Sequence, residues 1–161
     1  MSIPDEDKKM HSRSEFIDEL AMMLGGYVAE SEIFGDLTTG ASNDLQRATQ
    51  LAKELVTQYG MSDVLGPRTY GVGDEMVFLG KQIHESRDYS EKIAERIDEE
   101  MNKLLNDAKE TARRIIREQR PKMDAVVKHL LEKETIEKEE FIALIGPAVK
   151  ATTLVPLPAN V

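Results

Sequence analysis

The chain has 161 residues, enough for one domain with a real core, and it has no cysteine, which excludes disulfides and thiol chemistry. Its formal net charge of -9, with no basic block to neutralise phosphates, argues against a general nucleic-acid binder. No stretch approaches the roughly 18 apolar residues that a membrane-spanning helix needs, and no secretory signal is visible.

Apolar residues recur at helical spacing along most of the chain. Ser12 and Glu15 form a capping-box pattern, Gly25-Gly26 and Gly60 are predicted to end helices, and Pro121 is predicted to interrupt one. The helices expected from these signals cover roughly residues 12–24, 27–33, 44–59, 90–120, 121–131 and 137–145.

The predicted fold is therefore all-α, a bundle of about six helices, and no strand pattern is present. Residues 62–89 are rich in glycine and are expected to form an irregular loop. We expect one domain over residues 1–145 and a mobile tail over residues 146–161, which contain two prolines.

The longest periodic segment begins at Ser90 and has one apolar stripe, which suits either an intrachain core or a partner helix. The stripe consists of Ile93, Ile97, Met101, Leu104, Leu105, Ala108, Ala112 and Ile115. On the next expected helix, His129 lies on the apolar side. We expect it to be a core histidine with satisfied hydrogen bonds and not a metal ligand.

Asp44 is an acid placed where the apolar face of the third long helix begins. The residues on the same face are Ala48, Leu51, Ala52, Leu55 and Tyr59. This spacing directs Asp44 toward the interior, where a carboxylate needs a cation, a hydrogen-bond donor or a metal. Alternatively, Asp44 interacts with the N-terminus of its own helix, a contact worth about 0.3–1 kcal/mol. The residues alone leave both alternatives open.

A series of short motifs runs through residues 3–145. They are Leu24-Gly25-Gly26-Tyr27-Val28-Ala29-Glu30, the run from Phe34 to Thr49, the run from Val56 to Ser62, Leu65-Gly66-Pro67, Phe78-Leu79-Gly80, Tyr89-Ser90, Ile97-Asp98-Glu99-Glu100 and the run from Leu131 to Ile136. In this order they closely resemble the peptidase domain of FtsH-type ATP-dependent zinc metalloproteases. Several motifs in one order are far more specific than any single pattern.

In that family, zinc is held by two histidines of a His-Glu-x-x-His helix and by a distant aspartate, and the resemblance implies that Asp44 is this aspartate. The chain has only His11, His84 and His129, and Asp88 stands where His84 would need its partner. We therefore expect the C-terminal part of a peptidase domain, cut just after the histidine segment, with no catalytic residue of its own and inactive alone.

The resemblance also implies a second site residue and a set of partners. Glu30 matches the acidic position after Gly-Gly and is a candidate hydrogen-bond acceptor for a metal-bound histidine, although a role at an exposed helix end fits equally well. The implied parent binds zinc, binds ATP through an upstream module, and forms a homo-hexamer that degrades unfolded, membrane and cytosolic proteins.

The implied location of the parent is the cytoplasmic face of a bacterial inner membrane or of an organelle equivalent. The present part would be soluble and would contact neither membrane nor nucleic acid. The alternative is a natural, non-catalytic helical module that binds or organises a complete protease. A protease fragment and a natural non-catalytic module would both lack the histidine pair.

Overall fold

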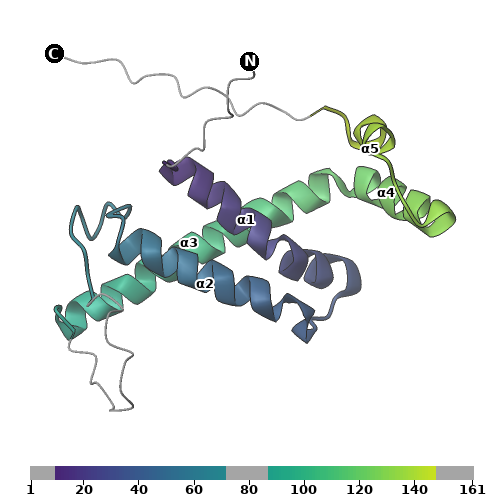
Figure 1. The fold of residues 1–161 in the computed structure, drawn as a ribbon. Helices are drawn as coiled ribbons and strands as arrows, with labels where there is room; N and C mark the ends of the chain where they lie inside the picture. The colour runs from purple at the N-terminus through teal and green to yellow at the C-terminus, as the bar shows by residue number, and fades with distance from the viewer. Residues whose placement is uncertain (1–9, 72–86, 148–161) are drawn as a thin grey trace, which may run out of the picture. The chain divides into compact units, whose positions relative to one another are not determined.

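The computed structural model describes residues 10–71 and 87–147, which contain helices and no strand (Figure 1), so the all-α prediction is confirmed. The elements are α1 (Arg13–Ala29), the π-helical turn η1 (Glu30–Phe34), the 3-10 turn η2 (Thr39–Ala41), α2 (Ser42–Thr57), α3 (Glu91–Glu118), α4 (Arg120–Lys133) and α5 (Lys138–Ile145). The chain divides into two compact units, Met1–Ile116 and Arg117–Val161.

The predicted irregular loop is described at its two ends, residues 62–71 and 87–89, and these contain turns and no helix. Residues 72–86 of this loop, and the predicted mobile tail from residue 148 onward, lie outside the described residues. Among the helices that the structure does describe, none combines the length and the apolar character needed to cross a bilayer.

α1 begins as predicted but does not end as predicted. Its capping box is present, because Ser12 Oγ accepts from the Glu15 backbone N–H at 3.3 Å and Glu15 Oε2 accepts from the Ser12 N–H at 2.7 Å. Gly25-Gly26 lies inside the helix, which continues through Ala29 into η1. The prediction of a separate helix over residues 27–33 was therefore wrong. The left-handed residue that ends this segment is Gly35, with φ of 66°.

The core of the first unit lies where α1 and α2, packed side by side, meet α3 (Figure 1). Leu20 of α1, Ala48 and Ala52 of α2, and Ala108 of α3 have no exposed surface. Ala48 and Ala52 suit the close packing of α2 on α1, and Ala108 joins the same cluster from α3 together with the partly buried Leu104 and Leu105. This contact fixes the positions of the three helices relative to one another.

A second cluster attaches the end of α2 and the chain that follows it to the N-terminal half of α3. Val56, Leu65 and Tyr70 pack with Ile97, and the Tyr70 hydroxyl donates to the Leu65 carbonyl at 2.8 Å. The two clusters use much of the apolar stripe of α3 as an intrachain core. One member was misplaced by the sequence pattern, because Ile115 is exposed and its neighbour Ile116 is buried.

The second unit contains α4 and α5, and none of the described residues of these two helices is buried. Pro121 lies in the first turn of α4, which confirms the predicted interruption after α3. His129 is only partly buried. Its Nε2 lies 3.3 Å from Glu140 Oε2 without hydrogen-bond geometry, so the expected satisfied core histidine is not found.

We expect Ala108→Leu to lower the free energy of unfolding by about 1–3 kcal/mol, because the added carbons have no space in the three-helix contact. Urea denaturation followed by circular dichroism measures this loss. Asn106→Leu, at an exposed position of the same helix, is the matched control and should change stability by less than about 0.5 kcal/mol. Equal effects of the two substitutions would contradict the packing assigned to Ala108.

A pH dependence is expected at the start of α5. The Glu137 backbone N–H, 3.2 Å from Glu140 Oε2, and then the Lys133 ammonium lower the pKa of Glu140 below its ordinary value. A carboxylate whose pKa is lower in the folded state adds stability above its unfolded pKa, and that stability is lost as the pH falls through the folded value. Acidification should therefore loosen the first turn of α5.

Glu137→Pro tests this assignment, because proline suits the φ of -79° at this position and removes the N–H. Glu137→Ala keeps the N–H and is the control. Carbon-13 NMR titration of the Glu140 carboxyl should give a higher pKa in the proline variant than in the alanine variant. Equal midpoints would mean that the backbone N–H is not the cause.

Candidate functional site

Asp44 lies in the first turn of α2, directly after the 3-10 turn η2. Thr38 begins that turn, because its Oγ1 accepts from the Gly40 N–H at 3.1 Å. The Ser42 N–H then bonds to the Thr39 carbonyl, and the chain continues into α2. The N-cap position of α2 is Ala41, which has no capping side chain and is buried. Local hydrogen bonds before the helix therefore set where Asp44 stands.

The side chain of Asp44 is 45% exposed, so the expectation that it points into the interior was wrong. The fully buried residues of α2 start at Ala48, while Leu45 packs against the core and Ala41 before the helix is buried, so Asp44 lies beside the packed face. Its Oδ1 is 3.9 Å from Arg47 Nη1, which is longer than a hydrogen bond and marks a loose ion pair on one helix. Asp44 thus presents a solvated carboxylate close to a helix N-terminus.

Glu30 is the first residue of η1, and its carboxylate binds the loop that leads to Asp44. Oε2 accepts from the Thr38 backbone N–H at 3.0 Å, and Oε1 accepts from Thr38 Oγ1 at 3.0 Å. A side chain at position 40 would crowd this arrangement, since a Cβ there would lie 3.2 Å from Thr38 Oγ1 and 3.4 Å from Glu30 Oε1. We call Glu30, Thr38 and Gly40 the loop clamp.

The loop clamp was not predicted from the sequence, although Glu30 itself was. Two hydrogen bonds account for two of the roughly four acceptor positions of the Glu30 carboxylate, so the others can still accept. Its predicted role beside a metal-bound histidine stays a prediction. In the described structure Glu30 stands at the end of α1 and its side chain binds Thr38 of the following loop.

The three histidines lie far apart in the sequence. His11 is exposed and its Nδ1 lies 4.0 Å from Glu15 Oε2, His129 belongs to the second unit, and His84 is outside the described residues. Within residues 10–71 and 87–147, no group of three or more His, Cys, Asp or Glu side chains could hold a metal ion. The described part of the chain can therefore offer Asp44 as one ligand of a larger site, not a site by itself.

A shallow, open depression lies on the outer side of α2, next to the Asp44 ion pair. Its volume is about 500 Å³, and Arg47 belongs both to it and to the contact with Asp44. The lining residues are Met23, Gln46, Arg47, Gln50, Leu51 and Glu54. Its lining combines the apolar side chains of Met23 and Leu51 with four polar or charged side chains.

We expect Glu30→Gln to loosen the loop clamp, because a glutamine side chain has one acceptor oxygen where the carboxylate offers two. One hydrogen bond to Thr38 should be lost, at a cost of about 0.5–1.5 kcal/mol. Amide hydrogen exchange at Thr38 and Gly40 should become faster. Glu99→Gln, at an exposed position of α3, should leave both rates unchanged, and unchanged rates in Glu30→Gln would show that the carboxylate does not hold the loop.

Comparison with known proteins identifies the family. Residues 1–144 match the family described as peptidase family M41. Three similar proteins are each named ATP-dependent zinc metalloprotease FtsH. The protein from Thermotoga maritima is 49% identical over 146 residues, which are 91% of this chain and 24% of the relative. That from Kosmotoga olearia is 48% identical over 147 residues, 91% of this chain and 23% of the relative.

The protein from Slackia heliotrinireducens is 50% identical over 146 residues, again 91% of this chain but 19% of the relative. The chain therefore spans about a quarter or less of the length of these relatives. The matched region contains both Asp44 and the loop clamp. The chain belongs to peptidase family M41 and corresponds to part of an FtsH-type zinc metalloprotease.

Proposed function

We propose that this chain is the distal part of the peptidase domain of an ATP-dependent zinc metalloendopeptidase, with Asp44 as the carboxylate ligand of the zinc. The observation that carries the proposal is the position of Asp44. In a chain of family M41, Asp44 is a half-exposed carboxylate in the first turn of a helix. The loop clamp lies just before this helix, and Arg47 contacts Asp44 only loosely.

The donor chemistry of Asp44 fits such a role. Catalytic zinc sites use three protein ligands plus water, and two imidazoles with one carboxylate are a known set. The two histidines would come from a part of the parent protein outside this chain. When bound, zinc polarises the scissile carbonyl and lowers the pKa of its water ligand.

The residues of this chain would hold and orient that ligand. The loop clamp would orient the backbone that enters α2, because its hydrogen bonds end at Gly40, four residues before Asp44. The loose pair with Arg47 leaves an Asp44 oxygen able to turn toward a metal. Glu30 retains acceptor capacity for the second nitrogen of a ligand histidine, in addition to its bonds with Thr38.

The remaining features of the parent are part of the same proposal. The names of the relatives include ATP dependence, which supports an ATP-binding module elsewhere in the parent. We propose homo-hexameric assembly, protein substrates of membrane and cytosol, and a position at the cytoplasmic face of a membrane. The open depression beside Arg47 is a candidate for the wall that faces the substrate. Residues 1–145 would form the peptidase part and residues 146–161 a tail.

The alternative, a non-catalytic module that organises a complete protease, makes a different prediction about the gene. Sequencing the native transcript upstream of the codon for Ile3 separates the two. An in-frame His-Glu-x-x-His within about one domain length supports the protease, and a genuine start codon at Met1 supports the module. In either case we expect the purified chain to cleave no casein.

We expect Asp44→Asn in the complete protein to reduce proteolysis by more than about a hundredfold and to leave ATP hydrolysis unchanged. Mutation of residues that only hydrogen-bond a metal ligand typically lowers metal affinity or activity by about 10–100-fold, so loss of a direct ligand should lower activity further. Casein degradation and phosphate release measure the two activities. Asp63→Asn, at a fully solvated position, is the matched control and should retain both. Preserved proteolysis in Asp44→Asn would remove the role assigned to this residue.

A further inference from the structure

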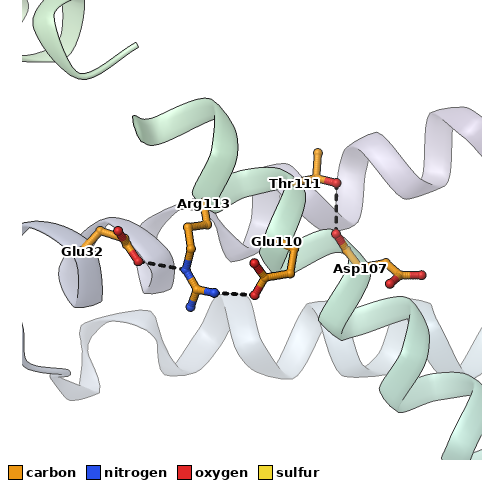
Figure 2. Close-up of polar contacts among 5 residues, drawn as sticks. All are labelled: Glu32, Asp107, Glu110, Thr111 and Arg113. Atoms are coloured by element: carbon orange, nitrogen blue, oxygen red, sulfur yellow. Dashed lines mark hydrogen bonds and ion pairs between the residues drawn. The ribbon is translucent and has the colours of Figure 1, made fainter. Parts of the chain in front are cut away.

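Arg113 connects α3 to the turn that precedes the loop clamp. Its Nε donates to Glu32 Oε1 at 2.8 Å, across 81 positions of sequence. Figure 2 shows the guanidinium between Glu32 on η1 and Glu110, which lies one turn earlier on α3 and accepts from Nη1. The nearby bond from Thr111 to the Asp107 carbonyl stays within α3.

This ion pair is well shielded from solvent. The side chains of Arg113 and Glu32 are 24% and 18% exposed. A second ion pair between distant parts of the first unit, Arg13 with Asp63, is 47% and 92% exposed. Shielded charges interact more strongly and are less screened by salt than surface pairs. The ion pair of Arg113 with Glu32 therefore restrains η1 more strongly than an exposed ion pair at the same place would.

η1 holds two acids that act on different neighbours. Residues two apart on a helix do not face each other, so Glu32 reaches α3 while Glu30 reaches Thr38. Single π-helical turns are rare and often occur at functional sites. Here the turn lies between the two contacts. A shift of η1 away from α3 would move the Glu30 carboxylate and, with it, Thr38.

We propose that Arg113 is a positioning residue for Asp44, acting through Glu32, η1 and the loop clamp. This inference rests on the proposed role of Asp44 as a zinc ligand. Metal ligands must stand within a few tenths of an ångström of their productive positions, so a small displacement of the backbone before α2 weakens the site. The effect would reach Asp44 without any contact between Arg113 and the metal.

The test uses the complete protein with Arg113→Gln, Arg113→Lys, Glu32→Gln and the control Arg13→Gln. Two quantities are measured well below the melting temperature: zinc affinity by competition with a chelator, and hydrogen exchange of the peptide that contains Thr38 and Gly40. We expect Arg113→Gln to weaken zinc binding by about 10–100-fold and to speed exchange. Arg113→Lys should recover part of both, and Arg13→Gln should change neither.

Because Arg113 contacts two acids, we expect the variants to differ in how much zinc affinity they lose. Arg113→Gln removes the cation that contacts both Glu32 and Glu110, whereas Glu32→Gln removes one of these two contacts and keeps that of Arg113 with Glu110. Zinc affinity should therefore fall less in Glu32→Gln than in Arg113→Gln. If Arg113→Gln does not fold, the comparison of Glu32→Gln with Arg13→Gln decides, and equal zinc affinities in that pair would overturn the inference.

The outcomes separate this inference from the proposed function. Normal zinc affinity in Arg113→Gln, together with lost affinity in Asp44→Asn, refutes the positioning role and retains Asp44 as the ligand. Normal affinity in Asp44→Asn refutes the ligand role. Unchanged hydrogen exchange at Thr38 and Gly40 in Arg113→Gln refutes the connection from α3 to the loop, regardless of the zinc affinity of that variant.

Discussion

The apolar cluster shared by α1, α2 and α3 is the contact on which the geometry of the first unit depends. Leu20, Ala48, Ala52 and Ala108 have no exposed surface in it, and the short alanine side chains on α2 suit the close packing of α2 on α1. A close contact of this kind tolerates little sliding. The apolar core therefore limits where the end of α1 and the start of α2 can lie, and the connection between them must run within a narrow region.

Polar side chains then determine the path of that connection. The carboxylate of Glu30 receives two donors from Thr38, and a glycine at position 40 leaves room for both partners. Glu32 on the same turn is drawn toward Arg113 on α3. The apolar core sets the distances between helices, and these charged and hydroxyl groups set the orientation of the segment that enters α2. The two kinds of contact therefore have separate roles.

Much of the fold could be predicted because helix signals are local. The capping box at Ser12 and the interruption at Pro121 depend on neighbouring residues, and both were correct. Gly25-Gly26 was misread, because glycine permits the end of a helix but does not require it. The burial of Asp44 was also misread, since helical spacing gives a direction but not how far the facing helix extends. Contacts such as that of Arg113 leave no periodic signal.

The solvation of Asp44 has a consequence for how such a protein matures. A carboxylate that is hydrated in the folded chain imposes little desolvation cost, so α1, α2 and α3 can fold around their apolar core without a metal. In this respect the chain differs from small domains that stay unfolded until zinc arrives. Under the proposed role of Asp44, zinc would therefore bind to a part of the chain whose three helices are already packed.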